Sequence, residues 1–257
     1  MKEGFCVEKI KTLCRVYITD SFDNKVVFCY TLLFPALYFV YMNFKQIRQA
    51  HHYSINEISN VFQPYWAYII FISLLNTVIV TTIVQRESGY YKEFYFIVGS
   101  KWLIFVANFI IQVAFILVEL LLFTILGMVL LRSWHFSILF SSLLGGILAV
   151  IPVTLGLSIL FVFRIKVQSL SVIGTLLFFV LCYIAALPSK TPLFHLMSLL
   201  NPYKYTIVLI GLSDSFVNNG NISFSSLIQL LIVTVAFCLI GLKGFSKFDI
   251  RPILDRL

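Results

Sequence analysis

Charged residues are scarce in this chain. Asp, Glu, Lys and Arg together make up 12% of its 257 residues, whereas 60% are hydrophobic and the mean hydropathy is +0.96. A soluble domain of this size needs a larger polar shell to cover its core. The composition therefore excludes an ordinary soluble protein and predicts an all-α, polytopic membrane protein, with residues 1–257 forming one transmembrane domain.

The sequence also lacks the motifs of several enzyme classes. No G-x-x-x-x-G-K-S/T segment is present, so we expect no nucleotide triphosphate site in this chain. The absence of His-Glu-x-x-His and G-x-S-x-G argues against a metalloprotease and an α/β hydrolase. Basic residues are spread over several segments, so the net charge of +8 does not indicate a nucleic-acid partner. We therefore predict no catalytic residues and no enzymatic activity.

Metal and disulfide chemistry are equally unsupported by the sequence. None of the five cysteines falls in a predicted outward loop, and no pair of them has metal-ligand spacing. His51 and His52 are adjacent, so on a helix they would point in different directions. We predict that this chain itself binds no metal and no cofactor. No cleavable signal peptide is expected, because the first apolar run starts late and no small-residue cleavage site follows it.

Long apolar runs dominate what is present. Each is near the length of about 20 residues that crosses a hydrocarbon core about 30 Å thick. They predict six membrane spans, at about Val26–Phe44, Tyr65–Val84, Trp102–Leu131, Phe136–Phe163, Val167–Leu187 and Phe224–Phe245. Between the first two, Asn43–Pro64 is polar and is predicted to be an outward loop.

The distribution of Lys and Arg predicts the orientation of these spans. One side carries only Lys45, Arg48, Arg132, Lys190 and Lys204. All the other Lys and Arg residues fall on the opposite side, together with both termini. Because short cytoplasmic loops are enriched in basic residues, we expect both termini to be cytoplasmic in a multi-pass protein of the cell membrane. The lipid bilayer, with its anionic lipids, is then a direct partner.

Two further segments have distinct patterns. Residues 1–24 place apolar side chains at helical spacing and lysines elsewhere, which predicts an amphipathic helix in the cytoplasmic interface. In residues 188–221, Leu193–Leu200 and Tyr203–Leu212 are each about half a span long and are bounded by prolines. We predict that these two form short re-entrant helices on the outer side, before the last span.

Glu119 is the one acidic residue deep within a predicted span. A carboxylate near the middle of a membrane is costly unless it is paired, protonated or in contact with water. Gln112 and Asn108 lie on the same face of this helix, and Asn76 on the second span is another possible partner. These four residues form a candidate cargo path or subunit seam. The alternative interpretation is a protonated or hydrogen-bonded contact between helices.

A charged bend separates the second and third spans. Gln85–Glu93 is followed by Gly99, Ser100 and Lys101, and the bend is too short to fold alone but long enough to contact a partner. The Arg86-Glu87-Ser88-Gly89 motif with this later Gly-Ser-Lys resembles the coupling segment of permease subunits from type II ATP-binding-cassette (ABC) exporters. Asn201-Pro202-Tyr203 resembles that family's Asn-Pro element, and the predicted layout of six spans is similar too.

The resemblance implies a complete functional assembly. Residues 85–101 would be a cytoplasmic coupling segment, in which Arg86, Glu87, Ser88, Gly89, Tyr90, Tyr91 and Lys92 contact a separate ABC ATPase subunit. Two copies of that ATPase would bind ATP and Mg, and a second permease, identical or different, would complete the exporter. The abundance of aromatic residues favours an amphipathic or hydrophobic cargo such as a drug, lipid or antimicrobial peptide. The alternative is a channel or secondary transporter that works without ATP.

Overall fold

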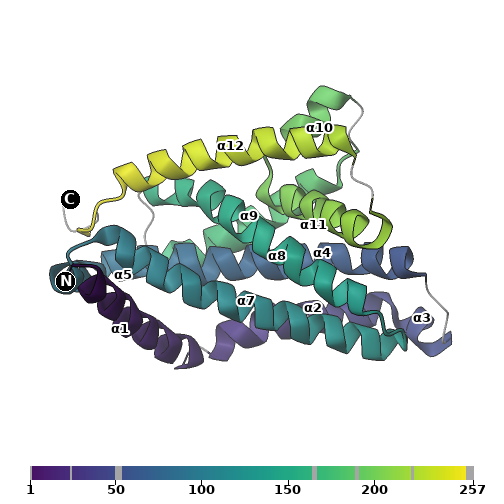
Figure 1. The fold of residues 1–257 in the computed structure, drawn as a ribbon, viewed down its shortest axis with the longest axis horizontal. Helices are drawn as coiled ribbons and strands as arrows, with labels where there is room; N and C mark the ends of the chain where they lie inside the picture. Colours follow the sequence, from purple (N-terminus) through teal and green to yellow (C-terminus); the bar gives the residue numbers. More distant parts are fainter. Residues whose placement is uncertain are drawn as a thin grey trace.

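The structure, a computed structural model, describes residues 2–23, 25–49, 54–163, 167–188, 191–220 and 223–252. Every regular element in these ranges is helical, as predicted, and the longest helices run along a common axis (Figure 1). The α-helices are α1 (Lys2–Asp23), α2 (Lys25–Met42), α3 (Phe44–Gln49), α4 (Ile55–Ser73), α5 (Thr81–Glu87), α6 (Tyr90–Val98), α7 (Lys101–Leu131), α8 (Phe136–Leu157), α9 (Val167–Ala186), α10 (Pro192–Ser198), α11 (Pro202–Asn219) and α12 (Phe224–Lys247). The π-helical η1 (Leu74–Val80) joins α4 to α5, and the 3₁₀-helical η2 (Ser158–Val162) extends α8.

Four helices within the described ranges are long and apolar enough to cross a membrane. They are Ile55–Glu87, Lys101–Leu131, Phe136–Val162 and Phe224–Lys247, and they correspond to the second, third, fourth and sixth predicted spans. The first and fifth predicted spans are the helices α2 and α9. Their described apolar portions, Phe28–Met42 and Val172–Ala186, are shorter than a full span. The structure therefore supports a membrane protein, while six crossings stay a prediction.

The second span is longer than the sequence pattern predicted. The Ser54 hydroxyl accepts a hydrogen bond from the Glu57 backbone, and the Glu57 carboxylate accepts one from the Ser54 backbone. This capping box starts α4 at Ile55, so Pro64 lies inside a helix. The prediction of a loop over Asn43–Pro64 is thus wrong for its second half, which belongs to α4. In its first half, Phe44–Gln49 forms the short helix α3. His51 and His52 lie outside the described residues, as does Lys190.

The predicted half-span helices differ in length. The first predicted segment, Leu193–Leu200, corresponds to α10. The second, Tyr203–Leu212, is part of the longer helix α11, which runs from Pro202 to Asn219 and ends at Gly220, where φ is 65°. Asn201 caps α11, because its side-chain oxygen accepts hydrogen bonds from the Tyr203 and Lys204 backbones. One side of α11 is buried against α4 and α8. Re-entry of either helix into the membrane stays a prediction.

The helix from α4 to α5 is the centre of the fold. In its most apolar stretch 72% of the residues are buried, compared with 22% in Phe224–Lys247. Aromatic rings of three helices meet around it: Phe62 lies between Phe39 and Phe123, with ring centroids 5.3 and 5.9 Å away. By contrast, α7 and α12 have one apolar face exposed, which is the surface expected to contact lipid.

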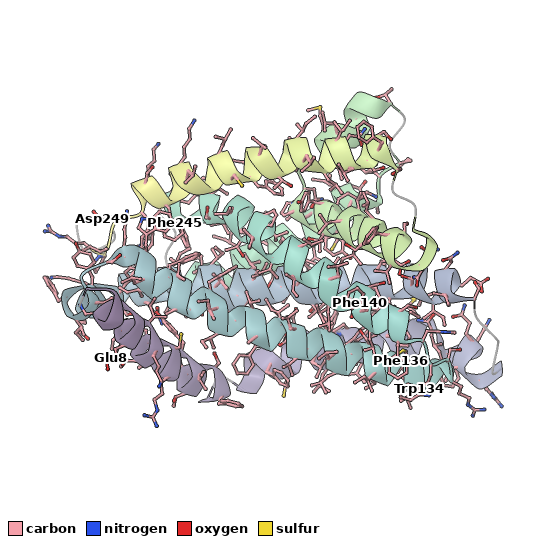
Figure 2. The ribbon with its side chains drawn as sticks, viewed as in Figure 1. Glu8, Trp134, Phe136, Phe140, Phe245 and Asp249 are labelled. Carbon is pink, nitrogen blue, oxygen red and sulfur yellow. The ribbon has the colours of Figure 1, made fainter. Side chains whose placement is uncertain are left out.

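The two ends of the bundle carry different elements. Glu8 on α1 and Asp249 beyond α12 lie at the end that also holds α5 and α6, whereas Trp134 and Phe136 lie at the opposite end (Figure 2). The α1 helix packs along the first half of α7, and its Leu13 and Tyr17 side chains are buried. The predicted helix at residues 1–24 is thus present, and its placement in a membrane interface stays a prediction.

Candidate functional site

Two glycines define the bend between the second and third long helices. Gly89, at φ of 86°, separates α5 from α6, and Gly99, at φ of 80°, ends α6. Both values fall in the left-handed region, where a side chain costs about 1–2 kcal/mol. The α6 helix is therefore a short, separate segment bounded by a glycine on each side.

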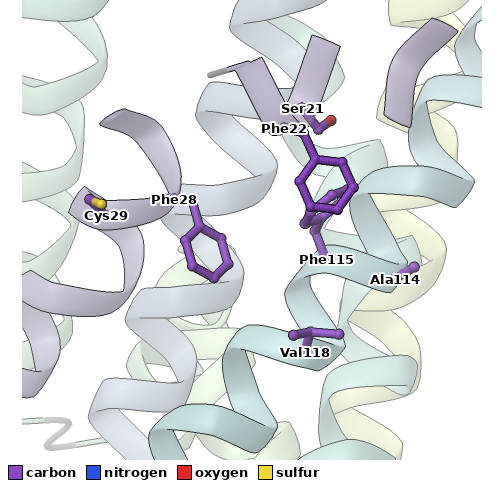
Figure 3. Close-up of a pocket in the computed structure, with 7 residues that line it drawn as sticks. All are labelled: Ser21, Phe22, Phe28, Cys29, Ala114, Phe115 and Val118. Carbon is purple, nitrogen blue, oxygen red and sulfur yellow. The ribbon is translucent and has the colours of Figure 1, made fainter. Parts of the chain in front are cut away.

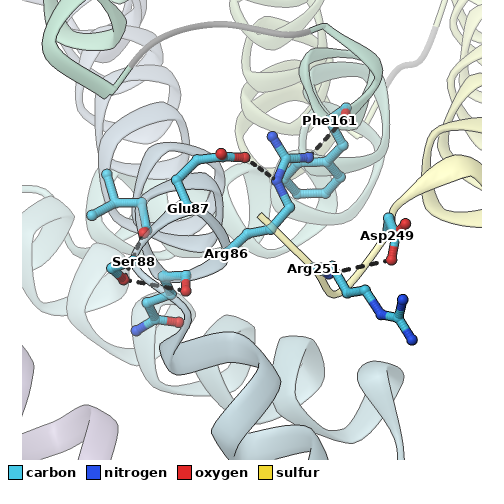
Figure 4. A network of polar contacts seen from close by, with 8 residues as sticks. Arg86, Glu87, Ser88, Phe161, Asp249 and Arg251 are labelled. Atoms are coloured by element: carbon cyan, nitrogen blue, oxygen red, sulfur yellow. Dashed lines mark hydrogen bonds and ion pairs between the residues drawn. The ribbon is translucent and has the colours of Figure 1, made fainter. Parts of the chain in front are cut away.

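Arg86 points into the protein. Its side chain is fully buried, and its Nε lies 2.7 Å from the Glu87 carboxylate. Its Nη1 donates to the Phe161 carbonyl at 3.2 Å (Figure 4), and its guanidinium lies over the Phe248 ring, 5.6 Å from the centroid. Arg86 thus joins α5 to η2 and to the segment after α12.

Tyr91 and Lys101 make further contacts to the same region. The Tyr91 hydroxyl donates to the Lys101 carbonyl at 2.7 Å, and its ring meets the Phe248 ring edge-on at 5.0 Å. The Lys101 ammonium donates to the Phe245 and Phe248 carbonyls at 2.9 and 3.0 Å, satisfying the C-terminus of α12. Burial raises the pKa of Tyr91, so its hydroxyl stays protonated as a donor. We call Arg86, Tyr91, Lys101, Phe245 and Phe248 the α12 clamp.

The predicted ATPase contacts therefore divide into two groups. Arg86 and Tyr91 are buried in the α12 clamp, and the Glu87 side chain is only 5% exposed. Ser88, Tyr90 and Lys92 are exposed. Other residues of α6 are exposed as well. The outer face of α6 consists of Tyr90, Lys92, Glu93, Phe96 and Ile97, of which Phe96 and Ile97 are each more than 70% exposed.

The N-terminal helix braces the same segment. Lys9 Nζ on α1 donates to the Val98 carbonyl at the end of α6, at 3.0 Å. The Tyr17 hydroxyl donates to the Gln85 side chain at 3.3 Å. Burial, with a smaller effect of Asp20, raises the pKa of Tyr17, so this donor also stays protonated. The α6 helix is thus held from one side by α1 and from the other by the α12 clamp.

Glu119 has partners that the sequence did not predict. Its two carboxylate oxygens accept hydrogen bonds from Thr31 on α2 at 2.6 Å and from Ser73 on α4 at 2.7 Å. All three side chains are buried. Hydroxyl groups in helices carry no periodic signal, so only the packing of α2, α4 and α7 could have identified this pair. The contact between helices that one interpretation expected is present, and a role in cargo transport stays a prediction.

The other predicted polar residues lie nearer to the start of α7 and in η1. Gln112 donates to the Ser21 hydroxyl on α1 at 2.9 Å and to Asn108 at 3.4 Å. The Asn108 side chain donates to the Thr77 backbone carbonyl in η1 at 3.3 Å. The backbone carbonyl of Asn76 accepts a hydrogen bond from the Thr81 hydroxyl. π-helical turns such as η1 shift the backbone register and often occur at functional sites.

Three cavities lined by described residues lie beside these elements. A polar cavity of about 40 Å³ brings Gln112 and Glu119 together; its lining is Asp20, Ser21, Phe28, Thr77, Thr81, Gln112, Phe115 and Glu119. An apolar cavity of about 530 Å³ adjoins it and is lined by Ser21, Phe22, Phe28, Cys29, Ala114, Phe115 and Val118 (Figure 3). An aromatic pocket of about 630 Å³ lies among α2, α4, α9 and α11, with Phe34, Tyr38, Tyr65, Tyr68, Phe178, Phe179 and Tyr203 in its lining.

Within the described ranges, no group of three His, Cys, Asp or Glu side chains could hold a metal ion.

The chain matches no protein-family model, and neither a curated protein nor a solved structure is significantly similar to it. The ABC permease resemblance thus stays a prediction from the motifs, and the structure itself supports an all-helical membrane protein.

Proposed function

We propose that this chain is the membrane-spanning permease subunit of an ATP-driven exporter, and that a separate ABC ATPase binds the outer face of α6. The observation that carries the proposal is the exposure of Tyr90, Phe96 and Ile97 on a short helix at the end of the bundle. Large apolar side chains flanked by charges are typical of protein interfaces. Lys92 and Glu93 supply those charges, and both are exposed.

The α12 clamp supplies a physical route from that interface to the membrane helices. If ATP binding in the partner moves α6, Tyr91 and Lys101 carry the motion to the end of α12, and Arg86 carries it to η2. The clamp consists of hydrogen bonds and ring contacts with little solvent, so it transmits displacement instead of absorbing it. This role replaces direct ATPase contact for Arg86 and Tyr91.

The aromatic pocket is the proposed cargo side of the assembly. Its rings and its position among α2, α4, α9 and α11 suit an amphipathic or hydrophobic cargo, exported between this chain and a second permease. The alternative, a channel or secondary transporter without ATP, would leave the exposed apolar side chains of α6 without a partner.

The test is affinity purification of the chain from native membranes in a mild uncharged detergent, followed by an ATP hydrolysis assay. The wild-type preparation should hydrolyse ATP, because the chain without a nucleotide motif would bring its ATPase with it. Phe96→Asp should remove most of this activity, because it places a charge in the apolar centre of the interface.

A matched variant separates a lost interface from a damaged protein. Phe136 is also an exposed phenylalanine, 86% exposed, but it lies at the opposite end of the bundle (Figure 2). Phe136→Asp should retain the co-purified ATP hydrolysis. A wild-type preparation without ATP hydrolysis, or equal activity in both variants, would refute the proposal.

A further inference from the structure

The apolar cavity has the size and the lining of a site for one alkyl chain. Its volume of about 530 Å³ falls within the range of small-molecule sites. Phe22 on α1 and Phe115 on α7 meet edge-on there, with ring centroids 5.4 Å apart. Ala114 and Val118 are exposed on the same side of α7, so a chain can enter sideways from the lipid.

The polar cavity adjoins this space and is much smaller. The two share Ser21, Phe28 and Phe115 in their linings. The polar cavity measures about 40 Å³, which is room for more than one water molecule. It therefore accepts a small polar head group.

The chemistry of the polar cavity selects a cation. Two of its lining residues, Asp20 and Glu119, are carboxylic acids, and none of its described lining residues is basic. Thr31 and Ser73 each use one acceptor site on the Glu119 oxygens, and the two oxygens of a carboxyl group have lone pairs for more than two hydrogen bonds. Acceptor capacity is therefore left on Glu119 for a donor in the cavity.

We propose that the two cavities together bind a single-chain amphipathic primary amine. Its alkyl chain would occupy the apolar cavity, and its ammonium group would donate to Glu119 and to the Thr77 and Thr81 hydroxyls. A primary ammonium is compact and offers three donors. A trimethylammonium group has no N–H to donate, and an anionic head group is repelled by carboxylates.

Binding at this site needs no ATPase, so it is tested on the full chain in nanodiscs of phosphatidylcholine without nucleotide. The probe is dodecylamine with a photoreactive diazirine at the end of its chain. Mass spectrometry should locate the adduct on the lining of the apolar cavity, around Ala114–Val118. Unlabelled dodecylamine should compete, whereas dodecanol and dodecyltrimethylammonium at the same concentration should not.

Variants test each half of the site. Glu119→Gln should weaken labelling about tenfold or more, the equivalent of one lost hydrogen bond to a charged group. Ala114→Trp should abolish labelling by filling the apolar cavity while leaving Glu119 unchanged. Ile110→Trp is the matched control, because Ile110 is 47% exposed on the same helix and is not among the described lining residues.

Competition by dodecanol equal to that by dodecylamine would overturn the proposed recognition of the ammonium group. Adducts spread evenly along the exposed side of α7, or unchanged by Ala114→Trp, would show ordinary bilayer contact and overturn the site. Protection of the cavity by a second copy of the chain, without competition by the amine, would equally contradict it. None of these results bears on whether an ATPase binds α6.

Discussion

At the residue scale, the fold has to accommodate polar groups among apolar helices. Glu119 is buried, yet both of its oxygens have hydroxyl donors, from Thr31 and Ser73. Because the three residues belong to α7, α2 and α4, the contact also fixes the relative positions of these helices. A buried polar group that loses its hydrogen-bond partner is left with an uncompensated desolvation cost.

Ser73→Ala is therefore expected to lower the free energy of unfolding by about 1–3 kcal/mol, since it leaves a buried Glu119 oxygen without its hydrogen-bond donor. The matched control is Ser59→Ala on the same helix, because the buried Ser59 hydroxyl has no hydrogen-bond partner among the described residues. Thermal unfolding of both variants in uncharged detergent measures the difference. Equal unfolding temperatures for the two variants would contradict the assigned role of Ser73.

Trp66 offers a second residue-scale test. Its indole nitrogen donates to the Thr124 hydroxyl at 2.9 Å, and both residues are fully buried. Thr124→Val keeps the shape of the side chain but leaves the indole N–H without an acceptor, which should destabilise the protein by about 1–3 kcal/mol. The measurement is thermal unfolding followed by tryptophan fluorescence. An unchanged unfolding temperature would mean that this hydrogen bond contributes no stability.

The sequence identified Glu119, Gln112 and Asn108 because polar residues are conspicuous in an apolar helix. It could not identify Thr31 or Ser73, because a hydroxyl in a helix ordinarily bonds a backbone carbonyl of the preceding turn. Which helices touch is a property of the packing, and no local pattern encodes it. For the same reason the inward direction of Arg86 was not predicted.

At the scale of elements, the close approach of α12 to η2 depends on Gly244. A Cβ added to Gly244 would lie 2.7 Å from the Ser158 carbonyl oxygen, and a backbone atom cannot move aside as a side chain can. Gly244→Ala should therefore push α12 away from η2 and destabilise the protein. Gly174→Ala is the control: its Cβ would meet only Leu75 at an ordinary 3.6 Å.

Because alanine favours a helix over glycine by up to about 1 kcal/mol, Gly174→Ala should be neutral or stabilising. Unfolding temperatures of the two variants give the comparison. If Gly244→Ala were as stable as Gly174→Ala, the described contact between α12 and η2 would be incorrect.

The α12 clamp makes a prediction at the same scale. Lys101→Met removes the ammonium group that bonds the Phe245 and Phe248 carbonyls, so the last turn of α12 should exchange its amide hydrogens faster. Lys243→Met, at an exposed position of the same helix, should leave that exchange unchanged. Equal exchange in the two variants, measured by mass spectrometry, would remove Lys101 from the clamp.

Four long apolar helices were predictable because their hydropathy and length suffice without knowledge of packing. The start of α4 was not, since Asn43–Pro64 is polar and Pro64 normally indicates a helix boundary. The capping box at Ser54 and Glu57 is a local signal that could have placed the boundary correctly. The full length of α11 depends on burial against α4 and α8, which only the three-dimensional structure provides.

At the scale of the whole molecule, the distribution of burial and exposure indicates three surroundings. The helix from α4 to α5 is enclosed by protein, the outer faces of α7 and α12 are exposed and apolar, and α6 presents aromatic and charged side chains at one end. The first two fit a protein inside a bilayer. The third is the surface on which the proposed function depends.

The most direct measurement of that function is photo-crosslinking from position 96 in intact cells. A photoreactive amino acid in place of Phe96 should crosslink to a cytoplasmic protein, and that protein should contain the G-x-x-x-x-G-K-S/T nucleotide motif that this chain lacks. A crosslink formed only with lipid, or position 96 labelled by a reagent confined to the outside of the cell, would contradict an ATPase bound to α6.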